Sequence, residues 1–152
     1  MKIRIELDSV DEDEITIRCK ELTPEIMRLQ QLISETTSRT SQFVLYKGDT
    51  EYYIELDKIL FFETENSMVL AHTVDNVYET RKKLYELEEM LPAAFLRISK
   101  SSIVNTSKIY SISRNLTASS AIEFQGTHKQ IYVSRAYYKV LKSKLEEKRY
   151  EQ

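Results

Sequence analysis

The chain has 152 residues, of which 41% are hydrophobic and 30% charged, with a formal net charge of −2 at pH 7. This length suffices for one main domain with a small appendage, and the composition is that of a globular protein. No run approaches the ~18 consecutive apolar residues of a membrane span, and the N-terminus lacks the apolar core of a signal peptide. Cys19 is the single cysteine, so no internal disulfide can form, and we expect a cytoplasmic protein.

Charge is distributed unevenly along the chain. Residues 1–65 contain 8 Lys and Arg against 15 Asp and Glu, whereas residues 97–149 contain 11 against 3. Salt screens charges that lie more than about 8–10 Å apart, so local charge matters more for nucleic-acid binding than the total. The basic C-terminal part therefore permits contact with phosphates, and an ordinary surface of uneven charge is the alternative interpretation.

Residues 1–40 are predicted to form a separate unit with the order ββα. Lys2–Leu7 and Glu14–Cys19 alternate polar and apolar residues, which predicts two short strands with one buried face each. Thr23-Pro24-Glu25 is typical of a helix start, with Thr as N-cap and Pro at the first helical position. The Ser/Thr-rich residues 34–41 have no apolar period and are predicted to be a linker.

Short β segments dominate the remainder, residues 43–149. Strands are predicted at Phe43–Lys47, Tyr52–Leu56, Ile59–Glu63, Met68–Thr73, Val77–Glu79, Phe95–Ile98, Ile109–Ser113, Ala121–Phe124 and Gln130–Val133. Helices are predicted at Arg81–Leu91, ended by Pro92, and from Ser134 onward. The expected fold is mainly β with a few helices, and the lack of strand–helix alternation argues against a Rossmann-type sheet.

Catalytic and metal-binding patterns are weak in this sequence. The two glycines, Gly48 and Gly126, cannot build a phosphate-binding loop, and no Gly-x-Ser-x-Gly motif occurs. A zinc site would have to combine Cys19 with both histidines from distant segments. Glu63 and Glu65 could act as an acid/base pair, but no nucleophile accompanies them, so an exposed sheet rim is the better interpretation. We predict no enzyme, no cofactor and no metal site.

Cationic side chains next to small hydroxyl residues are the most informative feature. They occur in Phe95–Asn105 and in Val133-Ser134-Arg135. Arg and Lys suit phosphates and base edges, and the serines can donate hydrogen bonds to phosphate oxygens. Arg135 falls in the first turn of the last helix, where free N–H groups also favour a phosphate. The candidate contacts here are Arg97, Ser99, Lys100, Ser101, Ser134, Arg135 and Lys139.

An ordered series of short segments resembles the LytTR DNA-binding domain of bacterial transcription regulators. These segments are Tyr53–Glu63, Leu84–Pro92, Phe95–Ser101, Ile103-Val-Asn105, Lys108-Ile109 and Val133-Ser134-Arg135. The resemblance implies an elongated bundle of short antiparallel strands over residues 43–149. It also implies that loops read successive major grooves of DNA. When the sequence is matched to the family position by position, the resemblance implies that the side chains that contact DNA bases are those of Asn66-Ser67-Met68, Lys100 and Arg135.

The resemblance also suggests how the protein is regulated. Many family members carry a long receiver domain, whereas the forty residues here leave no room for one. The chain looks like the stand-alone subgroup whose members are held inactive by a small membrane protein. We expect a homodimer on duplex DNA, with residues 1–40 as a regulatory or dimerisation extension. The alternatives are a protein-interaction module that acts as an antagonist without DNA binding and, with its many tyrosines, an RNA-binding β protein.

Overall fold

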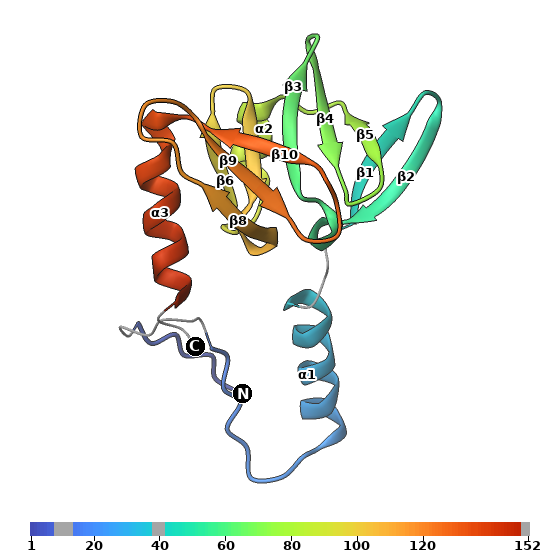
Figure 1. Cartoon of the computed structure of the whole chain (residues 1–152). Helices are drawn as coiled ribbons and strands as arrows, with labels where there is room; N and C mark the ends of the chain where they lie inside the picture. The colour runs from blue at the N-terminus through green and yellow to red at the C-terminus, as the bar shows by residue number, and fades with distance from the viewer. Residues whose placement is uncertain (8–13, 38–41, 150–152) are drawn as a thin grey trace. The chain divides into compact units, whose positions relative to one another are not determined.

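The computed structural model describes residues 1–7, 14–37 and 42–149, and the chain divides into two compact units. Within residues 1–37 the first unit contains the helix α1 (Pro24–Thr37). Residues 42–149 form the second unit, which contains ten strands, helix α2 (Leu84–Met90) and helix α3 (Arg135–Arg149) (Figure 1). The predicted class, mainly β with a few helices, is therefore confirmed.

Two antiparallel sheets make up the second unit. The larger has the order β2-β1-β5-β4-β3-β7-β6 and the smaller the order β10-β9-β8. Their bounds are β1 Gln42–Lys47, β2 Thr50–Glu55, β3 Phe61–Glu65, β4 Met68–His72, β5 Val77–Thr80, β6 Phe95–Ser99, β7 Ser102–Asn105, β8 Ile109–Ser113, β9 Ser120–Phe124 and β10 Gln130–Val133. Short 3-10 turns at Leu56–Lys58 and Thr106–Lys108 precede β3 and β8.

The larger sheet has an apolar cluster on each face. Phe61 and Phe62 are neighbours on β3, so their side chains point to opposite faces. Phe62 joins the cluster that α2 covers through Leu84 and Leu87, whereas Phe61 joins the cluster that contains Ile122 and Ile131 of the smaller sheet and Leu141 of α3. The central strands are thus buried on both sides, which makes them a stiff support for the turns that connect them.

Strand β7 was not predicted from the sequence. All four of its residues, Ser102–Asn105, are buried, because Ile103 faces one cluster and Val104 the other. A strand that is buried on both faces shows no alternation of polar and apolar residues, and this removes the signal on which strand prediction depends. The remaining predicted strands of this unit are confirmed, with the predicted ends at Ile109–Ser113 and Gln130–Val133 and with shifted ends elsewhere. The predicted helix Arg81–Leu91 is shorter, because Lys83 donates from its amide to Glu86 and the helix begins there.

The two strands predicted near the N-terminus are wrong. Residues 1–7 and 14–19 lie outside regular secondary structure, and Ile3 and Leu7 are 92% and 97% exposed. An alternating segment becomes a strand only where it finds a pairing partner and a surface for its apolar face, and two strands alone are marginal in water. The predicted helix start is confirmed, since the Ile26 amide donates to Thr23 Oγ1 at 3.2 Å. The predicted linker 34–41 is wrong over residues 34–37, which belong to α1, and residues 38–41 lie outside the described residues.

Candidate nucleic-acid interface

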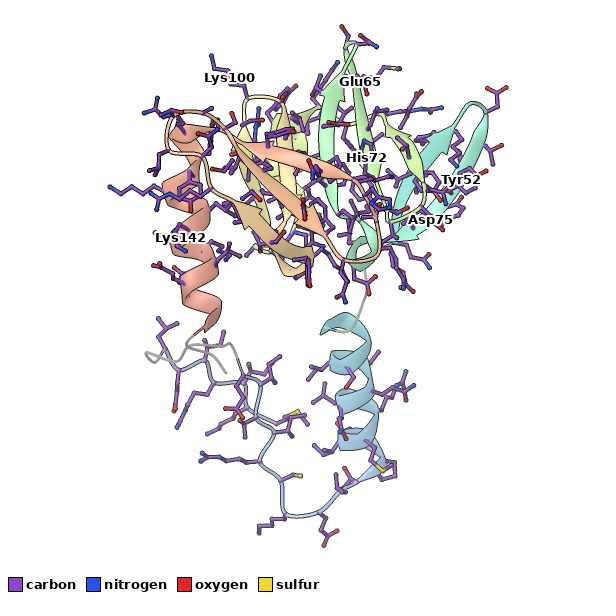
Figure 2. All side chains as sticks on the ribbon, viewed as in Figure 1. Tyr52, Glu65, His72, Asp75, Lys100 and Lys142 are labelled. Atoms are coloured by element: carbon purple, nitrogen blue, oxygen red, sulfur yellow. The ribbon has the colours of Figure 1, made fainter. Side chains whose placement is uncertain are left out.

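Three connecting segments lie toward one end of the second unit: the β3–β4 turn, the β6–β7 turn and the start of α3 (Figure 1). Figure 2 shows Lys100 and Glu65 at this end, with Asp75 toward the opposite end. The Thr64 amide donates to Ser101 O at 2.8 Å, which places the two strand turns side by side. We call this surface the turn face and define it by Asn66, Ser67, Lys100, Ser101 and Arg135.

The β3–β4 turn has a two-residue loop. Glu65 and Met68 are paired across the hairpin, and the residues between them, Asn66 and Ser67, have φ angles of 50° and 66°. Positive φ at both central positions is the mark of a type I′ turn, whose twist matches that of the flanking strands. All four residues are exposed. The turn therefore presents polar side chains on a short, well-defined support.

The β6–β7 turn is held from inside by Arg97. Its guanidinium donates to Ser99 O at 2.7 Å and to Lys100 O, and it contacts Glu88 Oε2 at 2.9 Å. The Arg97 side chain is only 20% exposed, whereas Lys100 is exposed at the tip of the turn. Arg97 was predicted to contact DNA, but its donors face protein groups, and Lys100 is the cation that this turn presents to solvent.

Serine side chains reinforce the same turn. The Ser101 amide donates to Ser99 Oγ at 3.2 Å, and the two hydroxyl oxygens lie 3.4 Å apart. Ser101 is exposed and Ser99 half-buried. Both hydroxyls thus lie at the surface next to Lys100, where they could donate to a phosphate oxygen.

The start of α3 is anchored to β6. The Ser134 amide donates to Ile98 O at 2.9 Å, and the Ser134 carbonyl accepts from the amides of Tyr137 and Tyr138. The Ser134 hydroxyl is buried, and none of the residues that the structure describes provides it with a hydrogen-bond partner. The next residue, Arg135, is exposed, and so is Lys139 one helical turn later. Ser134 is therefore placed to fix the helix start, while Arg135 and Lys139 are free to meet a ligand.

A small hollow beside α3 is lined by a basic side chain, Arg114, that was not predicted from the sequence as a DNA contact. It has a volume of about 130 Å³, and its lining includes Arg114, Asn115, Ser120, Arg135 and Tyr138. The Arg114 guanidinium lies 5.1 Å from the centre of the Tyr138 ring. Arg114 directly follows the predicted strand Ile109–Ser113 and lies within the basic residues 97–149. A basic residue in a loop of that region could have been predicted as a phosphate contact. Two arginines near a helix start form an electropositive site suited to a phosphate.

A polar cluster lies away from the turn face, where β4 ends. His72 Nε2 is 2.7 Å from Glu63 Oε1, and Lys129 donates to Thr73 O and Asn76 O at 2.8 and 2.7 Å. Burial, and then Lys129, lower the pKa of His72 to about 4, which outweighs the opposing effect of the Glu65 carboxylate and leaves the ring neutral at pH 7. Burial, and then Glu65, raise the pKa of Glu63. These contacts tie the smaller sheet to the β4–β5 turn, and we interpret the cluster as structural.

Other kinds of site have little support in the described ranges. No group of three or more His, Cys, Asp or Glu residues in residues 1–7, 14–37 and 42–149 could hold a metal ion. Over the same ranges, no helix is long and apolar enough to cross a membrane.

Comparisons with known proteins concern the family and the fold of the second unit. Residues 49–146 match the family model described as the LytTr DNA-binding domain. Uncharacterized HTH-type transcriptional regulators from Staphylococcus aureus strains MSSA476 and NCTC 8325 are 26% identical over 146 residues, covering 95% of this chain and 98% of each relative. A solved LytTr DNA-binding domain from Bacillus cereus superposes with a TM-score of 0.64 at 21% identity, covering 69% of this chain and 96% of that one.

Proposed function

Because the chain belongs to the LytTR family of DNA-binding domains, we propose that it is a sequence-specific transcriptional regulator that binds duplex DNA through the turn face. The observation that carries this proposal is that two strand turns and a helix start lie toward one end of a stiff sheet, with Lys100 and Arg135 exposed there. Turns of this size can enter a major groove, where base edges carry a distinct pattern of donors and acceptors.

The proposal gives the contacting residues different roles. Arg135 can donate two parallel hydrogen bonds to a guanine, whereas Lys100 is a flexible point charge that can contact a base edge or a phosphate. The neighbouring β3–β4 turn presents Asn66, Ser67 and Met68 to a second position in the major groove of the DNA. Hydroxyls of Ser99 and Ser101 donate to phosphates, and Lys139 and Arg114 add positive charge beside the backbone.

Two residues predicted to contact DNA are given supporting roles in this proposal. Arg97 donates to Ser99 O and Lys100 O in the backbone of the β6–β7 turn and to Glu88 of α2, and Ser134 fixes the start of α3. Their contribution to DNA binding is then to position Lys100 and Arg135. No catalytic step is part of this function.

Partners and location follow as further parts of the proposal. We expect a cytoplasmic protein that binds paired DNA sites as a homodimer. A small membrane protein that holds the regulator inactive is suggested by the resemblance to the stand-alone subgroup. Half-sites on one face of DNA would lie about one helical turn, 34–36 Å, apart or a multiple of it.

Selection of bound sequences from a pool of random duplexes tests the proposal directly. The full chain should enrich a defined motif, and the double variant Lys100→Ala/Arg135→Ala should not enrich it although it unfolds at a similar temperature. Failure of the wild-type chain to enrich any motif, with duplex DNA no better a competitor than single-stranded RNA, would overturn the proposal. Such a result would favour the interaction module or the RNA-binding alternative.

A further inference from the structure

Two segments of the first unit expose apolar side chains in an alternating pattern. In the first segment Ile3, Ile5 and Leu7 are 92%, 84% and 97% exposed. In the second segment Ile15 is 64% exposed and Ile17 is half-buried. No strand pairing joins residues 1–7 to 14–19 in the part of the chain that the structure describes. In an extended conformation, segments with this alternating pattern are suited to pairing with another strand.

Charge opposes an antiparallel hairpin between these two segments. If Leu7 lies opposite Ile15, the register places Arg4 opposite Arg18. If Ile5 lies opposite Ile15 instead, the register places Glu6 opposite Glu14. These two registers bring the most apolar side chains together, and each sets like charges directly across from one another, which destabilises a strand pair.

Pairing of the second segment with its own copy removes this conflict. We propose that Glu14–Arg18 of two chains pair antiparallel about a two-fold axis at Thr16, and that this pairing is a dimer interface. Glu14 of each chain then lies opposite Arg18 of the other chain, which gives two pairs of opposite charge on one face of the ribbon. On the other face, Ile15 of each chain lies opposite Ile17 of the other. The arrangement is self-complementary, as an isologous interface requires.

The first segment is a weaker candidate for such a pair. A two-fold axis at Arg4 would set this arginine against its own copy, and Arg4 already contacts Glu6 of the same chain at 3.6 Å. Two chains also contribute two α1 helices and two copies of each extended segment. They therefore supply the further elements that a two-stranded ribbon lacks on its own. This dimer gives the homodimer of the proposed function a structural basis, but it forms without DNA.

Charge exchange tests the pairing on the full chain without DNA. Sedimentation equilibrium should show a wild-type dimer, and Glu14→Arg or Arg18→Glu alone should weaken dimerisation at least tenfold, because each places like charges opposite one another. An equimolar mixture of the two variants should restore the dimer as a heterodimer, identified by its mass in native mass spectrometry. The control Arg4→Glu should dimerise as the wild type does.

Several outcomes would overturn the inference. A monomeric wild-type chain at all concentrations would do so, as would a mixture that stays monomeric. A more stable monomer in Arg18→Glu would indicate the internal hairpin instead. Because none of these measurements involves DNA, they fail or succeed independently of the proposed function.

A disulfide provides a second, geometric test. In a Cys19→Ser background, Thr16→Cys places a thiol opposite its own copy, within the Cα separation of 4.4–6.8 Å that disulfides span. Mild oxidation should therefore link the chains. Lys20→Cys is the matched control, because an extended pair separates it from its copy by about 27 Å at roughly 3.4 Å per residue. Equal cross-linking of the two variants would contradict the register.

Discussion

The Ser134 amide donates to Ile98 O, and this 2.9 Å hydrogen bond joins the start of α3 to the strand that leads into Lys100. Ile98 is fully buried, and Lys100 is exposed two residues later. The separation of Lys100 and Arg135 is thus set by the backbone and the core, whereas their own side chains are not needed to hold it. Substitution of either cation should change binding without changing the fold.

Arg135→Ala is expected to weaken specific DNA binding by about 1–3 kcal/mol, because a bidentate contact to a guanine would be lost. Fluorescence anisotropy with a selected duplex measures the change, and thermal unfolding checks that the fold is kept. Lys142→Ala is the matched control, since Lys142 is exposed farther along α3 (Figure 2). Equal losses in the two variants would indicate a general effect of charge on α3.

The salt dependence of DNA affinity distinguishes residues that contact phosphates from residues that only hold the contacting residues in place. Each phosphate contact contributes about −0.9 to the slope of log K against log salt. If Lys100 meets a phosphate, Lys100→Ala should make the slope shallower by about one unit. Measurement of Kd for one duplex from low to physiological salt gives the slopes, and an unchanged slope would assign Lys100 to a base edge.

Arg97→Ala should act through the β6–β7 turn. It removes hydrogen bonds to Ser99 O and Lys100 O and the contact with Glu88, which should lower stability by about 1–3 kcal/mol. DNA affinity should fall as Lys100 loses its fixed support, while the salt slope stays as in the wild type. Chemical denaturation and the salt series measure these effects. Glu88→Gln is the milder control, since it leaves both backbone contacts intact.

The sequence predicted much of the fold because most strands have one buried face. Where that asymmetry is missing, prediction failed, as in β7, which is buried on both faces. It also failed at the N-terminus, where Ile3 and Ile5 alternate with charged residues but find no covering surface within the described chain. Alternation of polar and apolar residues shows which face of a segment can be buried. The surface that covers this face depends on tertiary or quaternary structure.

For the candidate site, residue type and order predicted which segments to consider. They could not separate Lys100, which is exposed, from Arg97, which turns inward toward carbonyl oxygens only after the hairpin has formed. Arg114 was missed for a related reason, since its position beside Arg135 arises from packing of the β8–β9 connection against α3. Such neighbours are distant in sequence, so only the tertiary structure reveals them.

Ser67→Gly should distinguish turn geometry from contact chemistry. Ser67 has φ of 66°, which glycine adopts at lower cost, so stability should rise by up to about 1 kcal/mol. If the Ser67 hydroxyl contacts DNA, affinity for the selected duplex should fall although the protein is more stable. Denaturation and anisotropy on the same sample measure the two effects, and unchanged affinity would remove Ser67 from the interface.

His72 should make the stability of the second unit depend on pH. Its pKa is lowered from 6.5 to about 4, mainly by burial, so the unfolded chain takes up the proton first as the pH falls. The contribution of His72 is complete above about pH 6.5 and is lost progressively toward pH 4, by up to about 3 kcal/mol. Glu63 opposes this trend, because its raised pKa favours the folded state at low pH.

Urea denaturation of the wild type and of His72→Gln between pH 7 and pH 4 measures the His72 contribution, together with any change in Glu63 caused by loss of its 2.7 Å contact with His72. The variant should be less stable at pH 7, since it loses the ring stacked on Phe61 at 4.4 Å between centroids, but its stability should fall less with pH. His128→Gln is the matched control, because His128 is exposed and its removal should leave the wild-type slope unchanged. Parallel curves for the wild type and His72→Gln would show that His72 takes up its proton equally in the folded and unfolded chains, which would contradict its burial as the cause of the lowered pKa.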